Sequence, residues 1–195
     1  MIDIEAIFYQ QIKEIIESWN EPGIYAISFY VESNEAIECN GYSNLTNFSV
    51  SYNTEADCHN AGPYDEERWN YAFWRHNVTD IVDMYGPNDG AKLLFQWYAE
   101  NGIQNLGVEE EDCYDEACHY IGKGPVGHYE LLTIAANIAA RLQREKLIEK
   151  KFGKQLPIIV HGLEYPWYDI EATKRANPFG EAETFLQAME ELGMM

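Results

Sequence analysis

The segment from His161 to Asp169 carries the side chains best suited to acid–base chemistry. It reads His-Gly-Leu-Glu-Tyr-Pro-Trp-Tyr-Asp and follows a short apolar run, residues 156–161, that is typical of a buried strand. Sites often gather at strand ends in mixed α/β sheets, and His161 beside Glu164 or Asp169 can act as a general base. No G-x-S-x-G, H-E-x-x-H or dinucleotide motif accompanies this segment, so a structural histidine in a tyrosine-lined turn is the preferred interpretation. A hydrolase or small-molecule site near residues 161–169 stays the alternative.

A second set of side chains has the chemistry of zinc ligands but not the usual spacing. Cys113, Cys118 and His119 lie close together, and Cys58 and His59 are adjacent. Structural zinc sites usually combine two closely spaced pairs, whereas four residues separate Cys113 from Cys118 and each histidine abuts a cysteine. We therefore predict no metal site, and we expect free, reduced thiols.

The glycine-rich loop at residues 122–127 is the remaining candidate for ligand binding. It reads Gly-Lys-Gly-Pro-Val-Gly and precedes a helical pattern, so its N–H groups are placed to hold an anion. Its lysine is not followed by Ser or Thr, and Pro125 removes one N–H donor. We interpret the loop as a turn and helix cap, and we predict no nucleotide or other cofactor.

The distribution of charge is the strongest functional signal in the chain. The formal net charge is -20, and residues 1–140 contain 24 of the 33 Asp and Glu but five of the 13 Lys and Arg, a net of -19. A field of this sign repels nucleic acid and anionic lipid, and it accelerates encounter with basic proteins. The predicted partner-binding residues are Glu109, Glu110, Glu111, Asp112, Asp115 and Glu116, followed by Asp65, Glu66 and Glu67.

Six basic residues gather between positions 141 and 154. Cations near the C-terminal end of a helix offset its dipole, which is a sufficient explanation for the patch. The alternative is that the patch docks on the acidic region of a second copy, which would make the protein a homo-oligomer. The patch consists of Arg141, Arg144, Lys146, Lys150, Lys151 and Lys154.

Hydrophobic periodicity predicts one α+β domain over residues 1–195, with a largely antiparallel sheet packed by several helices. The predicted strands are 24–31, 36–40 and 46–52, which form an antiparallel meander, and 156–161, with Pro157 placing its start at an edge or at the first position. The predicted helices are 3–19, a short one from 53, 89–101, 128–152 and 180–192. Within 65–85 the aromatic residues 69–74 suit a strand and residues 78–85 suit a helix.

The chain is expected to be cytosolic. Its first residues lack a basic segment followed by an apolar one, and no apolar stretch approaches the roughly 20 residues needed to span a bilayer. A composition with 46% hydrophobic residues excludes a disordered protein.

The order of short motifs resembles a widespread bacterial family of about this length that is known only as a domain of unknown function. The motifs are Tyr25-Ala-Ile-Ser-Phe-Tyr, Asn53-Thr-Glu55, Arg68-Trp69 before Trp74, and Ala176-Asn-Pro178. Small acidic proteins similar to this one occur near polymorphic-toxin genes, where some act as immunity proteins. The resemblance therefore implies a role as an inhibitor, and none of its motifs is catalytic.

The leading hypothesis is a cytosolic, non-enzymatic protein that uses acidic residues to bind a basic protein. A nuclease toxin is the most specific form of that partner, because clustered carboxylates compete for the Lys and Arg that meet the nucleic-acid backbone. The other hypotheses are the site near residues 161–169 and a homo-oligomeric protein whose acidity has no dedicated partner.

Overall fold

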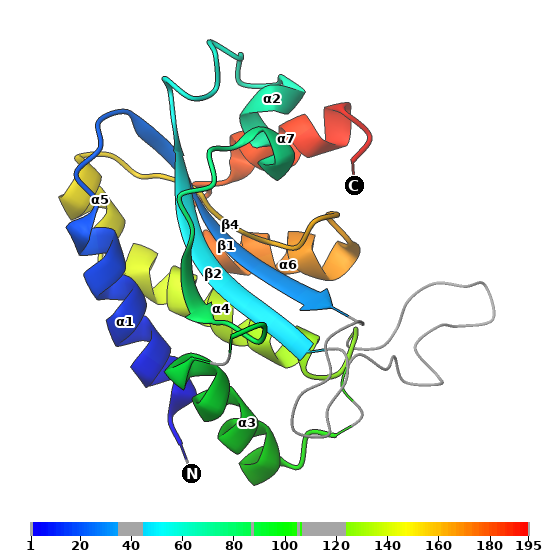
Figure 1. Ribbon diagram of the computed structural model, residues 1–195. Helices are drawn as coiled ribbons and strands as arrows, with labels where there is room; N and C mark the ends of the chain where they lie inside the picture. Colours follow the sequence, from blue (N-terminus) through cyan, green and yellow to red (C-terminus); the bar gives the residue numbers. More distant parts are fainter. Residues whose placement is uncertain (1, 35–44, 87, 105, 107–123, 195) are drawn as a thin grey trace.

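The computed structural model describes residues 2–34, 45–86, 88–104, 106 and 124–194, and it contains one four-stranded sheet with helices on both faces (Figure 1). The strands are β1 (Ile24–Asn34), β2 (Leu45–Thr54), β3 (Thr79–Val82) and β4 (Ile158–His161). The helices are α1 (Ile4–Ser18), α2 (Glu66–Trp69), the 3-10 helix η1 (Tyr71–Phe73), α3 (Asp89–Asn101), α4 (His128–Arg144), α5 (Leu147–Phe152), α6 (Trp167–Ala176) and α7 (Glu183–Glu191).

The sheet has the strand order β3-β2-β1-β4. β1 pairs antiparallel with β2, and β2 pairs antiparallel with β3. β4 is parallel to β1, so the carboxyl ends of these two strands lie at the same edge of the sheet. The predicted class, a single α+β domain with a largely antiparallel sheet, is confirmed.

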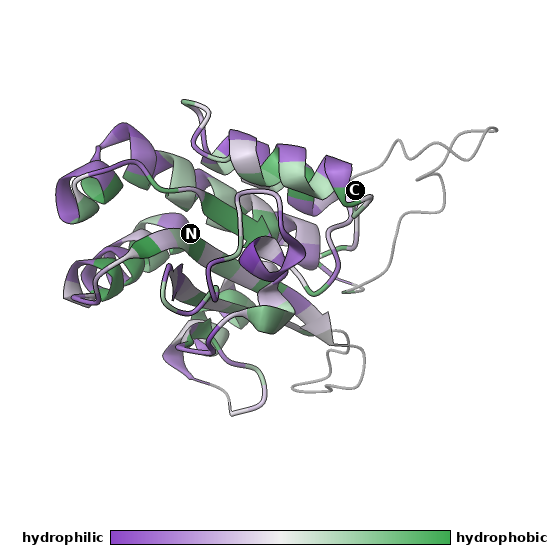
Figure 2. Cartoon of the chain, turned by 90° about the horizontal axis from the view of Figure 1, so that it is seen from above, coloured by the Kyte–Doolittle hydropathy of each residue, from purple (hydrophilic) through white to green (hydrophobic). Residues whose placement is uncertain are grey.

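Side-chain alternation along β1 divides the interior into two cores. Ile27 and Phe29 face a first core that includes side chains of α1, α3 and α4, whereas Ala26 faces a second core that contains residues of α2, η1, α6 and α7. The view from above shows apolar strands at the centre and helices whose polar surfaces face outward (Figure 2). None of the helices in the described residues is long and apolar enough to cross a membrane.

Helix α6 covers the outer edge of β4 with buried polar side chains. Asn177 Oδ1 accepts the Ile158 N–H at 3.0 Å, and Asn177 Nδ2 donates to the Ile158 carbonyl at 2.8 Å. Thr173 Oγ1 accepts the Val160 N–H and donates to the Val160 carbonyl, each at 2.9 Å. Because an uncovered strand edge exposes unpaired backbone groups, this arrangement completes the sheet where a fifth strand would otherwise bind.

Helix α6 makes a third polar contact just beyond the end of β4, at Gly162. Asp169 Oδ2 accepts the Gly162 N–H at 2.6 Å. Asp169, Thr173 and Asn177 are spaced four residues apart and therefore share one face of the helix, while residues 158, 160 and 162 alternate along the strand direction. The helical and strand periods thus place Asp169 at the carboxyl end of β4.

Several elements lie where the sequence predicts them. Asp3 caps α1 by accepting the Ala6 N–H, and Gly102 ends α3 in the left-handed conformation with φ of 65°. β1, β2 and α7 fall within a few residues of the predicted ranges, and β4 lies at a sheet edge directly after Pro157. The predicted strand at 36–40 lies outside the described residues.

The predictions for residues 53–85 are wrong in detail. β2 continues to Thr54, where Glu55 N–H donates to the Gly23 carbonyl, so no helix begins at residue 53. The aromatic segment 66–73 forms two short helical turns, where a strand was favoured. The segment 79–82 forms a strand, where a helix was favoured. The aromatic content of the first segment reflects packing in the second core, a tertiary effect that overrides local propensity.

Two further differences concern the C-terminal half. The predicted helix 128–152 is interrupted at Lys146, whose φ of 56° places it in the left-handed region and separates α4 from α5. Helix α6 was not predicted at all, because its buried face includes Asp169, Thr173 and nearby Asn177 and therefore lacks a fully apolar stripe.

Candidate functional site

His161 lies inside the second core and not in an open site. Its side chain is 1% exposed, and burial lowers its pKa to about 4. Its Nδ1 lies 2.7 Å from the Gly162 carbonyl, so Nδ1 carries the proton and Nε2 accepts the hydroxyl proton of Ser28 at 2.8 Å. Rings of three tyrosines, Tyr30, Tyr71 and Tyr165, surround it.

These contacts favour the structural interpretation of His161. Its hydrogen bonds go to Ser28 and Gly162, and not to Glu164 or Asp169, the partners that a general base at this position was expected to use. The Ser28–His161 distance is that of a nucleophile and its base. Ser28 is fully buried, however, His161 is 1% exposed, and neither residue lines the two cavities described below.

Asp169 is a buried carboxylate with an oxygen that has no hydrogen-bond partner among the described residues. It is 1% exposed, and although Oδ2 accepts the Gly162 N–H, no donor among the described residues reaches Oδ1. Burial raises the pKa of Asp169 to about 7. A buried carboxylate oxygen without a donor is costly, and such groups call for a functional explanation.

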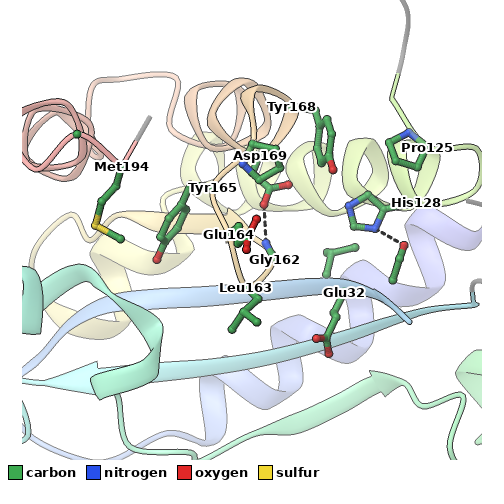
Figure 3. A pocket seen from close by; sticks show the side chains of 14 residues that line it. Glu32, Pro125, His128, Gly162, Leu163, Glu164, Tyr165, Tyr168, Asp169 and Met194 are labelled. Carbon is green, nitrogen blue, oxygen red and sulfur yellow. Dashed lines mark hydrogen bonds between the residues drawn. The ribbon is translucent and has the colours of Figure 1, made fainter. Parts of the chain in front are cut away.

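Asp169 lines a cavity of about 670 Å³, which we term cavity A. Cavity A lies where β4 ends beside β1, between Val31–Ser33 and the segment Gly162–Pro166, with His128 of α4 on its far side (Figure 3). Figure 3 shows one oxygen of Asp169 bonded to Gly162 and the other directed toward Tyr168 and His128. Crevices at the carboxyl ends of parallel strands are common ligand sites, and this volume is typical of them.

His128 and Ser33 form a second histidine–serine pair, which the sequence did not indicate. Ser33 Oγ lies 2.8 Å from His128 Nδ1 and 3.2 Å from Thr46 Oγ1, and both Ser33 and His128 line cavity A. Burial lowers the pKa of His128 to about 4. A base of this pKa is weak at neutral pH, so the pair is better explained as a contact that joins β1 to the start of α4.

A second cavity adjoins the first on the sheet face that carries Tyr30 and Glu32. This cavity B, of about 530 Å³, shares Glu32 and Leu163 with cavity A. Its lining also contains Asp80 and Asp83. Burial and the charge of Asp83 raise the pKa of Asp80.

We refer to the two cavities together as the acidic groove. Its carboxylates are Glu32, Asp80, Asp83, Glu164 and Asp169, and no Lys or Arg of the described residues lines either cavity.

Exposed apolar side chains border the acidic groove. Val78, Tyr85 and Leu163 line cavity B and are 42%, 66% and 67% exposed. Large exposed apolar groups next to unpaired charge are a feature of binding surfaces and not of a solvated polar face.

Seven acidic side chains of the described residues form ion pairs with Lys or Arg, and the groove carboxylates are not among them. Within the described residues, none of the five forms an ion pair with Lys or Arg. The carboxylates that do form such pairs are Glu21 and Asp57 with Arg75, Glu55 with Arg68, Asp89 with Lys92, Glu145 with Arg141, Glu149 with Lys146, and Glu171 with Lys174.

The predicted partner-binding residues that the structure describes do not coincide with this groove. Asp65, Glu66 and Glu67 are exposed at the start of α2 and do not line either cavity. Glu109–Asp112, Asp115 and Glu116 lie outside the described residues. The groove acids come from the strands β1 and β3, two loops and helix α6, so no local run of acidic residues marks them in the sequence.

The structure describes only part of the Cys/His set and of the glycine-rich loop. Cys113, Cys118 and His119 lie outside the described residues, and the described part contains no cluster of three or more His, Cys, Asp or Glu able to hold a metal. Cys58 is a buried free thiol. In the glycine-rich loop, Gly127 caps α4, and its N–H donates to Glu130 at 2.6 Å, as expected of a cap.

Most of the basic patch is occupied by contacts within the chain. Arg141 forms an ion pair with Glu145 and stacks on the Tyr9 ring at 3.7 Å, and Lys146 pairs with Glu149. Lys150 and Lys151 donate to backbone carbonyls at Glu145 and Glu17. These contacts support the explanation by local electrostatics, and they leave self-association an untested prediction.

Three of the four short motifs behind the family resemblance come together as a structural cluster. The Tyr25 hydroxyl donates to the Arg68 carbonyl and accepts from Asn53. The Arg68 guanidinium lies 4.0 Å from the Tyr25 ring centroid and is bonded twice to Glu55. Trp69 packs edge-on against Tyr25. These residues therefore attach the α2 region to the sheet and do not form a reactive site.

The chain matches no protein-family model, no curated protein and no solved structure. The resemblance to a bacterial family of unknown function therefore stays a prediction.

Proposed function

We propose that the protein is a non-enzymatic binding protein that takes a basic segment of a protein partner into the acidic groove. The observation that carries this proposal is the set of five groove carboxylates without a basic partner, next to exposed apolar side chains. The net charge of -20 supports it, because such a field steers a basic protein toward the surface before contact.

Inhibition of a nuclease toxin in the cytosol is the more specific form of this proposal. Its support is the resemblance described above together with the chemistry of the groove, where carboxylates replace the phosphates that a nuclease would bind. Residues 109–116 remain a predicted second part of the interface.

The test compares two variants that each remove three negative charges. The groove variant combines Glu32→Gln, Asp80→Asn and Asp83→Asn. D83N keeps an oxygen to accept the Tyr85 and Gly86 N–H groups, so the turn after β3 retains its contacts.

The control variant combines Glu14→Gln, Asp89→Asn and Glu190→Gln, three carboxylates outside the groove. Wild type and both variants serve as baits in host lysate at low salt, and retained proteins are identified and then released by salt. We expect a basic protein that wild type and the control retain and the groove variant loses, with added nucleic acid competing for it.

Equal retention by the two triple variants would mean that only overall charge matters, and it would remove the groove from the proposal. Charge reversal at 109–112 in an otherwise wild-type bait tests the second predicted part separately. If neither change affects retention of a basic protein, the protein uses neither surface for that partner.

A further inference from the structure

Cavity A contains a hydrogen-bond acceptor for which the described residues supply no donor. Asp169 is held on one side by Gly162 N–H, and its other oxygen is buried, has no donor among the described residues and is directed into the cavity (Figure 3). The missing partner is therefore a hydrogen-bond donor that reaches the cavity from outside.

The surroundings of Asp169 favour a donor with positive charge. Glu32 and Glu164 line the same cavity, and within the part of the chain that the structure describes no Lys or Arg lines it. Tyr165 and Tyr168 supply aromatic rings, which attract organic cations. Leu163 and Met194 supply apolar surface for an uncharged body.

A metal ion fits these observations less well than an organic cation. The described residues include no cluster of three or more His, Cys, Asp or Glu close enough to bind one ion. A single buried oxygen with aromatic and apolar neighbours suits a head group that donates N–H bonds and carries its charge on nitrogen.

We propose that cavity A binds an organic cation, a primary ammonium or guanidinium on a short apolar body, whose N–H group donates to Asp169 Oδ1. The same chemistry has two sources, a free small amine and the Lys or Arg side chain of a protein. The inference holds without the proposed protein partner, because small amines test it directly.

Protonation of Asp169 adds a pH dependence to this binding. The pKa of the buried carboxyl is raised to about 7 in the empty cavity, and a cation favours the ionised form. Affinity should therefore rise as pH increases through about 7. The other titratable groups that line the cavity are Glu32, Glu164, His128, Tyr165 and Tyr168, and the lowered pKa of His128, about 4, keeps its ring neutral in this range.

The experiment titrates the ¹⁵N-labelled full chain with butylammonium and butylguanidinium, with butanol as a neutral control. The reporter is the amide signal of Gly162, whose N–H is bonded to Asp169. The buffer contains about 0.15 M salt, which suppresses attraction by distant surface charge. We expect saturable shifts with at least one cation and none with butanol.

Two variants with the same change in net charge identify the group responsible. D169N keeps an oxygen for the Gly162 N–H but removes the charge, and it should lower the affinity about tenfold or more. D89N changes an exposed carboxylate on α3 and should leave the affinity unchanged. Should D169N fail to fold, E164Q replaces it, since Glu164 is exposed and lines the cavity, and a several-fold loss is expected.

A blocked tripeptide, acetyl-Gly-Lys-Gly-amide, distinguishes the two sources. Binding at least as tight as that of butylammonium would assign the cavity to a protein side chain, and binding of butylammonium alone would assign it to a small amine. The proposal is overturned if no cation shifts the Gly162 signal, if butanol binds equally well, or if D169N binds as tightly as wild type.

Discussion

The D169N variant should become progressively more stable than wild type as pH rises. The pKa of Asp169 is raised from an ordinary value of 3.8 to about 7 by burial. Between these two values the folded protein holds a proton that the unfolded chain has lost, so the wild-type free energy of unfolding falls as pH rises. The variant has no such proton and lacks this dependence.

The size of the effect follows from the two pKa values. Each pH unit between them corresponds to about 1.4 kcal/mol, so ionisation of Asp169 in the folded state costs roughly 4 kcal/mol once pH exceeds about 7. In the practical range from about pH 5.5 to 8.5, the difference in unfolding free energy, D169N minus wild type, should increase by about 2 kcal/mol. Most of that increase should fall below pH 7.

Urea denaturation followed by tryptophan fluorescence measures this difference, and the chain has five tryptophans, of which Trp19, Trp69 and Trp74 are buried. Urea is preferred to guanidinium because guanidinium is itself a cation of the class proposed for cavity A. D89N is the control. The hydrogen bond to Lys92 lowers the pKa of Asp89, so this carboxylate stays ionised throughout the pH range of the experiment. A difference for D169N that stays constant from pH 5.5 to 8.5 would refute the reasoning, since it would mean that Asp169 Oδ1 is already solvated.

Two further predictions concern the contacts that position the site. Gly90→Ala should destabilise the protein by about 3 kcal/mol or more in urea denaturation, because the new Cβ would lie 1.8 Å from the Ile81 carbonyl oxygen. Gly102→Ala is the control and should cost only about 1 kcal/mol, because the space around Gly102 is open. Equal losses of stability in the two variants would contradict the packing argument. Thr173→Val should cost about 1–3 kcal/mol because it leaves the Val160 N–H and carbonyl unpaired, whereas T173S keeps the hydroxyl and should retain protection of that amide from hydrogen exchange. Equal protection of the Val160 amide in both Thr173 variants would show that the hydroxyl does not cover the strand edge.

Elements with local signals were predictable from the sequence, and elements with tertiary causes were not. Helix α1 combines an Asp3 cap with a regular apolar stripe, and α3 ends at a glycine that adopts a left-handed conformation. Helix α6 gives the opposite result, because part of the face that it buries is polar and periodicity analysis assigns polar residues to solvent. Only the position of β4 shows why that polar face is buried.

Cavity A lies beside the segment 161–169 that the sequence indicated, and it is lined by Glu164 and Asp169 but not by His161. His161 and Gly162 are neighbours, yet the strand period directs the His161 side chain into the second core and the Gly162 N–H toward α6. Asp169 therefore meets Gly162 and not His161. The groove acids Glu32 and Asp80 meet only through the pairing of β1, β2 and β3, which a single sequence does not specify.

Neutral side chains are sufficient to cover the edge of β4, so the negative charge of Asp169 needs another explanation, and a bound ligand supplies one. Thr173 and Asn177 each satisfy both an N–H and a carbonyl of β4, with neutral side chains. At Gly162 only the N–H needs an acceptor from α6, because its carbonyl accepts the proton of His161. An amide at residue 169 would fill this role without the cost of ionisation, so coverage of the edge does not account for a carboxylate here. A cation in cavity A does account for it, because it would pair with the second oxygen and offset the cost of keeping that charge buried.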